Sequence, residues 1–321
     1  MTAADVGTAA RPVLVFVLGS GRSGTAALTR VLSLCGAASP AGMLGANSDN
    51  PRGYWEPRQA VYLNEVILRR NGSAHYDPSL RLQEHGALDP EEKAACVAEI
   101  GVFLAKLPAA PVVVIKDPRI TLLTGVWFEA AHEAGFDVAT VIAVRHPEEV
   151  NASVGAKTRV SQEFSSALWL KYLLLAERQT RGLPRVFVEY ANLLEDWRRE
   201  VKRISAALAI DLDTRDEAAI DEFVKPDLRR QRYSGPVTEP FGTDWMSTVY
   251  ETLRAATRDE SWDGAGLDRV FEVYRASERA FSTVFEDFHR FHKLNSVVPP
   301  LVWKLVNEVA AIAHRRRGTW A

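Results

Sequence analysis

The chain has 321 residues, which corresponds to about two ordinary domains or to one large α/β domain. Apolar residues make up 47% of it and charged residues 25%, close to globular averages, so a disordered or fibrous protein is excluded. The 39 Lys and Arg nearly balance the 41 Asp and Glu, and the formal net charge of −2 argues against a dedicated nucleic-acid-binding protein. Arg outnumbers Lys by 30 to 9, and a guanidinium grips phosphate or sulfate with two parallel hydrogen bonds.

The chain contains two cysteines, Cys35 and Cys96. Two thiols without a Cys/His cluster predict neither a disulfide framework nor a structural zinc site, so we expect no metal. The N-terminus lacks a charged segment followed by a long apolar core, and no run approaches the roughly 20 apolar residues that span a bilayer. These features predict a cytoplasmic protein.

Four continuous apolar segments predict strands that are buried on both faces of a sheet. They are Pro12–Leu18, Val112–Ile115, Val138–Val144 and Arg185–Val188. Helical patterns lie between and after them, at 24–35, 58–70, 90–107, 121–135, 147–155, 163–182 and 193–209. Strands that alternate with helices imply right-handed crossovers, so the predicted fold class is α/β with a parallel sheet flanked by helices.

Residues 12–225 are predicted to form one domain, in which 37–111 is a long insertion before the second strand. The insertion opens with a Gly/Pro/Asn-rich stretch, 38–57, and stretches of that length in compact domains are usually functional or disordered. Strand signals stop after about residue 225. Helical patterns at 245–258, 267–289 and 301–317 make 226–321 a predicted C-terminal helical extension packed on the core.

A glycine-rich loop, Leu18-Gly-Ser-Gly-Arg-Ser-Gly-Thr25, follows the first strand and opens a helix. Its backbone N–H groups can point into one concavity at the helix N-terminus and bind a tetrahedral anion. Gly19 and Gly24 have Walker A spacing, but Thr25 replaces the lysine that an ATP-binding loop uses, and Arg22 is the only cation of the loop. The loop predicts a P-loop-like anion site without magnesium. A plain glycine turn between strand and helix is the alternative.

A second anion signal follows the third strand. Arg145 lies at the carboxyl end of that strand, where open parallel sheets bind ligands. Pro147 fits the first position of a helix, and Ser153 falls two turns further along it. An anion that touches both Arg145 and Ser153 must lie along this helix. The alternative for Arg145 is a surface ion pair.

Together these features resemble the sulfotransferases that use 3′-phosphoadenosine 5′-phosphosulfate (PAPS). The segment from Arg22 to Thr25 looks like their 5′-phosphosulfate loop, with Arg where cytosolic members carry Lys. Arg145 and Ser153 look like their 3′-phosphate pair. The segment after the fourth strand resembles one in which a tyrosine lies near the adenine, and this places Tyr190 there. The resemblance covers residues 12–36, 112–125 and 138–210.

The resemblance implies PAPS as donor and 3′-phosphoadenosine 5′-phosphate (PAP) as product, with no metal. A sulfuryl group carries less charge than a phosphoryl group, so N–H groups and one or two cations can stabilise its transfer. Ala26 and Ala27 replace a hydroxyl residue and an aromatic residue of many members, so one phosphate contact and one stacking partner must come from elsewhere or be absent. The implied donor-binding residues are Arg22, Ser23, Gly24, Thr25, Ala26, Ala27, Arg145, Ser153 and Tyr190.

Sulfuryl transfer to a hydroxyl also requires a base. Cytosolic members use a His two residues after a Lys that follows the second strand. Here Lys116 matches that Lys, which would lie beside the transferring sulfuryl, but Pro118 replaces the His. Carbohydrate-type and bacterial members have a Glu after the helix of the phosphosulfate loop, and Glu56 resembles it, so Glu56 is the predicted general base. His75 is the rival base, and a Glu that faces water is the alternative for Glu56.

Three further features keep two interpretations each. Asp117 and Arg119 are either a structural ion pair or catalytic. Arg229, Arg230 and Arg232 form a cationic turn that resembles the family's late loop over the 3′-phosphate, with Arg229 and Arg232 as the implied donor contacts, and a solvated charge run fits equally well. The apolar and basic residues of 297–317 suit a helix docked on the core better than a helix on an anionic membrane.

The sequence therefore predicts transfer of a sulfuryl group from PAPS to a hydroxyl of a small-molecule, sugar or glycolipid acceptor. Glu56 would take the proton, and Lys116 and Arg22 would stabilise the leaving oxygen. The insertion and the C-terminal helices would form the acceptor pocket. The alternatives are a P-loop kinase-like phosphotransferase that uses ATP·Mg, with Lys116 and Asp117 ending a Walker-B-like strand, and a non-catalytic nucleotide-binding protein of the same fold. The expected partner is the acceptor, and no nucleic-acid partner is expected.

Overall fold

The structure is a computed structural model, and it divides the chain into two compact units, Met1–Phe271 and Glu272–Ala321. All candidate site residues belong to the first unit. The predicted helix at 301–317 falls, apart from Val302, outside the described residues, so its docking or membrane contact stays a prediction. The structure describes residues 11–46, 50, 52–83, 87–213, 216–225, 228–296 and 302.

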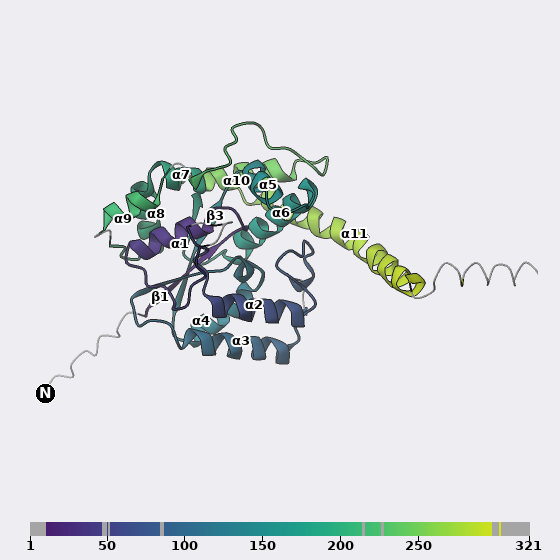
Figure 1. The fold of residues 1–321 in the computed structure, drawn as a ribbon, viewed down its shortest axis with the longest axis horizontal. Coiled ribbons are helices and arrows are strands. Elements are labelled where there is room, and N and C mark those ends of the chain that lie inside the picture. Colours follow the sequence, from purple (N-terminus) through teal and green to yellow (C-terminus); the bar gives the residue numbers. More distant parts are fainter. Residues whose placement is uncertain are drawn as a thin grey trace, which may run out of the picture. The chain divides into compact units, whose positions relative to one another are not determined.

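The core of the first unit is a four-stranded parallel sheet in the order β2-β1-β3-β4 (Figure 1). β1 (Val13–Leu18) pairs with both β2 (Val112–Lys116) and β3 (Asp137–Val144), and β4 (Arg185–Glu189) pairs with β3. The four predicted strands are therefore present, and the predicted fold class, an α/β protein with a P-loop-like parallel sheet flanked by helices, is confirmed. The carboxyl ends of the strands meet at one edge of the sheet, which positions the residues that follow them.

The helices account for most of the remaining described chain, and those at 58–70 and 147–155 have the predicted bounds. Two short 3₁₀ helices, η1 (Arg81–Gln83) and η2 (Pro118–Leu122), lie among them. The α-helices are α1 (Thr25–Leu34), α2 (Arg58–Arg70), α3 (Pro90–Leu104), α4 (Thr124–Glu133), α5 (Pro147–Gly155), α6 (Gln162–Gln179), α7 (Tyr190–Glu195), α8 (Trp197–Leu208), α9 (Glu217–Phe223), α10 (Trp245–Ala256) and α11 (Ala265–Ser296).

The two faces of the sheet are covered by different helices, because successive side chains of a strand point to opposite faces. On one face Val15 of β1 belongs to a buried apolar cluster with Val31 of α1 and Ile204 of α8. On the other face the Phe16 ring lies 6.0 Å from the ring of Trp127 and 5.3 Å from that of Phe128, both on α4. Burial on both faces explains why the strands are continuous apolar runs.

The insertion is tied to the sheet domain by buried polar contacts. Asn64 of α2 is fully buried, and its amide donates to Asp117 Oδ2 at 2.8 Å and accepts from Trp127 Nε1 at 2.7 Å. The fully buried Lys171 of α6 donates to the backbone oxygens of Asp77 (2.9 Å) and Ser79 (2.5 Å). The insertion therefore forms a fixed wall of the domain rather than a loose appendage.

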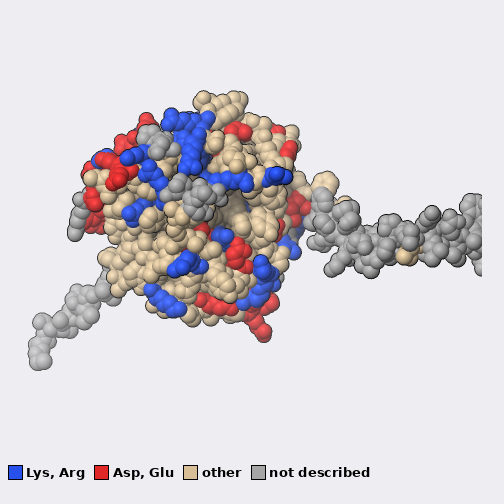
Figure 2. Space-filling model, in the orientation of Figure 1, with Lys and Arg blue, Asp and Glu red and all other residues tan. Residues whose placement is uncertain are grey.

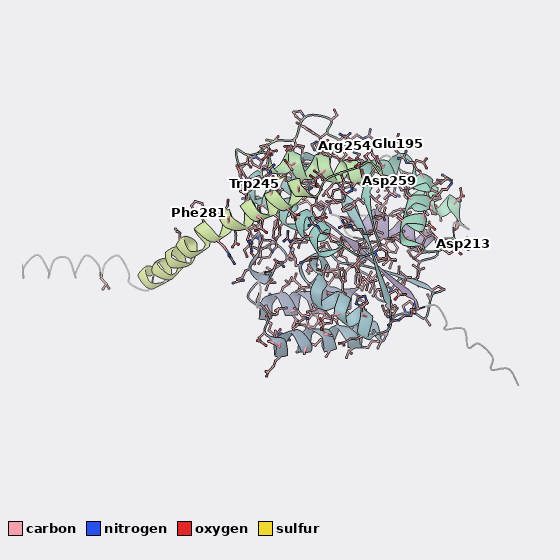
Figure 3. The ribbon with its side chains drawn as sticks, turned by 180° about the vertical axis from the view of Figure 1, so that it is seen from behind. Glu195, Asp213, Trp245, Arg254, Asp259 and Phe281 are labelled. Atoms are coloured by element: carbon pink, nitrogen blue, oxygen red, sulfur yellow. The ribbon has the colours of Figure 1, made fainter. Side chains whose placement is uncertain are left out.

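The first helix after the cationic turn also packs on the sheet domain. α10, which carries Trp245 and Arg254 (Figure 3), contacts α6 and β4, and its Tyr250 hydroxyl donates to Glu189 Oε1 at 2.8 Å. The predicted domain limit at residue 225 stays a prediction. Over the part of the chain that the structure describes, no helix combines the length and the apolar character needed to cross a membrane.

Candidate functional site

The glycine-rich loop is pressed against two neighbouring segments. Gly19 has φ 125°, and a Cβ there would lie 2.7 Å from the backbone oxygen of Ala143 in β3. Gly24 has φ 89°, and a Cβ there would lie 2.2 Å from the ring of Tyr190. Both positions therefore require glycine for space and for backbone conformation. The loop leads straight into α1, so the first N–H groups of this helix face the region that the loop encloses.

A cavity of about 300 Å³ lies beside this loop, at the carboxyl ends of β1, β2 and β3. It gathers residues from five separate parts of the sequence, namely the loop, the insertion, the end of β2, the segment that follows β3 and the segment that follows β4. Ten of the predicted site residues line it. They are Arg22, Gly24, Thr25, Ala26, Ala27, Glu56, Lys116, Arg145, Ser153 and Tyr190.

The other predicted residues lie outside the lining. Ser23 is fully buried, and its hydroxyl oxygen has no hydrogen-bond partner among the described residues. Arg229 contacts Glu149, and Arg232 is exposed, with its Nε donating to the Arg229 backbone oxygen at 3.4 Å. Arg230 of the same turn lines the cavity instead. The cationic turn therefore lies beside the cavity, but it is Arg230 that reaches the lining and not the predicted Arg229 or Arg232.

Three cations in the lining were not among the predicted site residues: Arg52 and Lys157, which sequence reasoning missed, and Arg230, which it placed in the cationic turn without a role at the site. Together with Arg22, Lys116 and Arg145 they make six cations, against the single carboxylate of Glu56, among the described lining residues. Lys157 lies two residues beyond the end of α5, so helical spacing from Ser153 could not have placed it. Lys and Arg side chains gather over the upper and central part of the face in Figure 2. Such a concentration of positive charge favours a ligand with several negative groups.

Arg145 is buried and held in place from three directions. Its Nε donates to Glu149 at 2.9 Å, and its two terminal nitrogens donate to the backbone oxygens of Arg22 (2.9 Å) and Gln231 (3.2 Å). Its guanidinium carbon lies 4.8 Å from the centre of the Tyr190 ring. The ion pair considered for Arg145 therefore exists, but it is buried and not on the surface. Arg145 joins the glycine-rich loop to the cationic turn.

Glu149 is the anchor of this cluster. It is 1% exposed, and it accepts hydrogen bonds from Arg145, from two nitrogens of Arg229 at 2.5 and 3.0 Å, and from the backbone N–H of Tyr233 at 3.1 Å. Burial alone would raise the pKa of Glu149, but the hydrogen bonds from Arg229 and Arg145 outweigh it and lower that pKa below its usual value. The carboxylate therefore fixes the cationic turn against α5.

The two predicted anion-binding elements contact each other through Arg22. This residue has φ 68°, in the left-handed region, and its Nε donates to the Ser153 hydroxyl oxygen at 3.0 Å. A non-glycine residue in this conformation needs support from its surroundings, and the hydrogen bond from Arg145 to the Arg22 backbone oxygen supplies part of it. The Arg22 side chain thus points toward the predicted 3′-phosphate pair.

Glu56 and Lys116, sixty residues apart, form a buried ion pair at the edge of the cavity. Lys116 Nζ lies 2.5 Å from Glu56 Oε1 and also donates to the Tyr54 backbone oxygen at 3.2 Å. Glu56 is 7% exposed, so the alternative in which it faces water is wrong. The Leu44 N–H donates to the Glu56 backbone oxygen at 2.7 Å, and Trp55, just before it, has φ 55°. The backbone around Glu56 is therefore pinned and locally strained, a pattern that often marks functional sites.

Asp117 and Arg119 form a structural network behind this pair. The fully buried Asp117 accepts from Asn64 at 2.8 Å and from Arg119 at 2.8 Å. Arg119 also donates to Glu65 at 2.6 Å, and His75 Nδ1 lies 3.1 Å from the same Glu65 oxygen. His75 lies outside the cavity lining. The geometry accounts for Asp117 and Arg119 as an ion pair and places Glu56, not His75, in the cavity wall.

In the parts of the chain that the structure describes, no group of three or more His, Cys, Asp or Glu side chains could hold a metal ion. The cavity can hold an elongated polyanion by its cations and backbone N–H groups, and it presents one carboxylate beside one ammonium. These are the groups that proton removal and stabilisation of a leaving oxyanion require.

No protein-family model and no curated protein matches the chain. Among solved structures, the sulfotransferase domain of the Synechococcus PCC 7002 olefin synthase is 17% identical, over 83% of this chain and 96% of that chain, with a TM-score of 0.38. Sulfotransferase STF1 from Mycobacterium tuberculosis is 15% identical, over 66% and 71%, with a TM-score of 0.37. Retinol dehydratase in complex with androsterone and the inactive cofactor PAP is 13% identical, over 79% and 83%, with a TM-score of 0.34. The structures similar to this chain are thus sulfotransferases and a dehydratase crystallised with PAP. Because these similarities are low, the function is argued from the residues of the cavity.

Proposed function

We propose that this protein is a sulfotransferase that moves a sulfuryl group from PAPS to the hydroxyl of an acceptor. The observation that carries the proposal is the single cavity in which a P-loop-like turn, six cations and the Glu56–Lys116 pair converge. The cations suit a donor with two separate anionic groups, and the carboxylate suits removal of a hydroxyl proton.

The donor would lie along the cavity with its anionic groups on two clusters. The backbone of residues 23–27 at the N-terminus of α1 would bind the 5′-phosphosulfate. Arg145 and Ser153 would bind the 3′-phosphate, and Arg22, which was expected at the leaving oxygen, would join them there, because its Nε contacts the Ser153 hydroxyl oxygen. The adenine would lie near Tyr190, and Phe223, which also lines the cavity, can provide the stacking surface that Ala27 lacks. Arg230 extends the same cationic wall.

The transfer assigns one role to each member of the buried pair. As the acceptor oxygen forms its bond to sulfur, the hydroxyl proton goes to Glu56, and the bond between sulfur and the bridging oxygen breaks. The negative charge that develops on the departing phosphate oxygen is stabilised by Lys116, with the helix N–H groups of the loop. Positioning and preorganised charge supply the catalysis.

A kinase-like reaction is less well supported, for a reason in the geometry of Asp117. A Walker-B-like aspartate must present its carboxylate to magnesium, whereas both oxygens of Asp117 are occupied, one by Asn64 and the other by Arg119. Asp117 is also fully buried and outside the cavity lining. A non-catalytic nucleotide-binding protein differs from an enzyme only in turnover, so an assay of transfer distinguishes them.

Calorimetry and a transfer assay test the proposal. We expect PAP to bind more tightly than ATP·Mg, and ³⁵S from labelled PAPS to appear on a hydroxyl compound. Glu56→Gln should lower kcat by at least about a hundredfold, the usual contribution of a general base, while PAP affinity changes little. The matched control is Glu195→Gln, because the Glu195 side chain is 74% exposed. Preference for ATP·Mg would refute the donor, and full turnover by Glu56→Gln would refute the base.

A further inference from the structure

We infer that a second cavity, which shares Glu56 and Tyr54 with the donor cavity, is the acceptor subsite and that it selects an uncharged hydroxyl compound with an apolar body. The inference rests on the proposed function. Its volume is about 500 Å³, within the usual range for small-molecule sites. Besides the shared residues, its lining includes the apolar side chains of Leu44, Ala46 and Val61 and the guanidinium of Arg119.

The position of Glu56 makes this cavity the natural place for the acceptor. A general base must reach the hydroxyl proton while the reacting oxygen faces the donor, so it must lie where the two binding sites meet. Glu56 lines both cavities, and its carboxylate is fixed there by Lys116. An acceptor that fills the second cavity can therefore present its hydroxyl to Glu56 without entering the cationic donor cavity.

The walls of the second cavity are held in a defined arrangement. Met43 and Pro57 form an antiparallel bridge, and the Leu44 N–H donates to the Glu56 backbone oxygen at 2.7 Å. The Val61 N–H donates to the Pro57 backbone oxygen at 3.0 Å, so Val61 sits on the first turn of α2. These bonds fix the apolar side chains at a constant place relative to the base, which a binding site for a small molecule requires.

The charges of the two cavities differ in a way that predicts the chemistry of the acceptor. The donor cavity has six cations in its described lining, whereas the described lining of the second has one, Arg119. The Arg119 guanidinium is already paired with Glu65 at 2.6 Å and with Asp117 at 2.8 Å. Among the described lining residues an anionic acceptor would find no unpaired positive charge, so its desolvation would not be offset by an ion pair. An uncharged compound avoids that cost and gains from contact with the apolar side chains.

Gly45 offers a substitution that adds bulk at the cavity lining without a clash at the new Cβ. It lines the cavity, its φ is not in the left-handed region, and a Cβ there would meet no atom within 4 Å. Gly45→Leu should therefore fold and reduce the space for the acceptor. Gly125→Leu is the matched control, because Gly125 is an exposed position of α4 where a Cβ also meets no atom within 4 Å.

The probes are 2-naphthol and 6-hydroxy-2-naphthoate, which have the same ring system but differ by a carboxylate. We expect labelled PAPS to sulfate 2-naphthol with a kcat/KM at least about tenfold higher than that for the naphthoate. Gly45→Leu should lower kcat/KM for 2-naphthol by at least about tenfold, since small changes in pocket volume have effects of this size. The Kd for PAP should stay within about twofold. Gly125→Leu should change neither. The fluorescence of 2-naphthol, titrated with the PAP complex, reports binding directly.

The outcomes separate this inference from the proposed function. Wild-type kcat/KM in Gly45→Leu, or 2-naphthol that neither binds the PAP complex nor is sulfated, would place the acceptor elsewhere. Faster sulfation of the naphthoate, or of glucose, would refute the selection for an uncharged apolar body. If the unaltered protein does not bind PAP, that result would instead refute the donor assignment on which the inference depends.

Discussion

Replacing Glu149 by Gln removes the charge that holds the cationic turn against α5. The carboxylate is 1% exposed and joins Arg145, Arg229 and the Tyr233 N–H. Glutamine keeps the shape and one acceptor oxygen, so the perturbation is mainly electrostatic. It leaves the 7%-exposed Arg145 without its counter-ion, and an uncompensated buried charge of this kind costs roughly 3–5 kcal/mol.

The expected loss lies at the lower end of that range. Arg229 keeps 28% of its side chain exposed, so water screens part of its charge. A loss of about 3 kcal/mol corresponds to a fall in Tm of about 9 °C, at roughly 3 °C per kcal/mol for a domain of this size. The phosphate groups of PAP would restore a negative partner near Arg145, so PAP should raise the Tm of Glu149→Gln more than that of the unaltered protein, provided that the variant still binds it.

Thermal unfolding followed by circular dichroism, with and without PAP, measures both quantities. Glu217→Gln is the matched control, because Glu217 pairs with Arg198 on the surface with about half of each side chain exposed. Exposed pairs of this kind contribute about 1 kcal/mol or less, so the control should shift Tm by no more than about 3 °C. A Glu149→Gln Tm within the same limit would refute the reasoning that the buried carboxylate anchors the turn.

Two further substitutions test the loop and the pH response. Gly24→Ala places a Cβ 2.2 Å from the Tyr190 ring at φ 89°, so it should weaken PAP binding by more than about tenfold in calorimetry, whereas Gly125→Ala should not. Unchanged affinity would show that the loop does not bind the donor. Burial lowers the pKa of His146 below its usual value of 6.5. In the unfolded chain His146 therefore binds a proton at a higher pH than in the folded protein, so the free energy of unfolding should fall as pH drops below about 6.5. Chemical denaturation at pH 5.5 and 7.5 should show a smaller difference for His146→Asn, and an equal difference would contradict this assignment.

Local patterns were enough to predict the sheet and the position of the cavity beside the glycine-rich loop. A strand buried on both faces needs a continuous apolar run, and a tight turn between a strand and a helix needs glycine for its backbone conformation. Each pattern can therefore be identified within a short window of sequence. Arg145 could be placed for the same reason, because any residue at the end of a parallel strand reaches the edge where ligands bind. These elements require no knowledge of distant parts of the chain.

The cationic turn shows the limit of such reasoning. From the sequence, Arg229, Arg230 and Arg232 are equivalent, since a turn has no fixed period to assign a direction to each side chain. The structure directs Arg229 to Glu149, Arg230 to the cavity and Arg232 outward. That choice depends on a buried carboxylate eighty residues earlier in the chain.

The sequence by itself thus determined the parallel α/β core, the P-loop-like turn and ten of the residues that line the cavity beside it. Tertiary structure alone decided that Glu56 is buried against Lys116, that Arg52, Lys157 and Arg230 join the cationic wall, and that a second cavity lies beside Glu56. The physical reason is that strand and helix patterns are fixed by near neighbours, whereas ion pairs and cavities arise where distant segments meet and their charges and volumes must match.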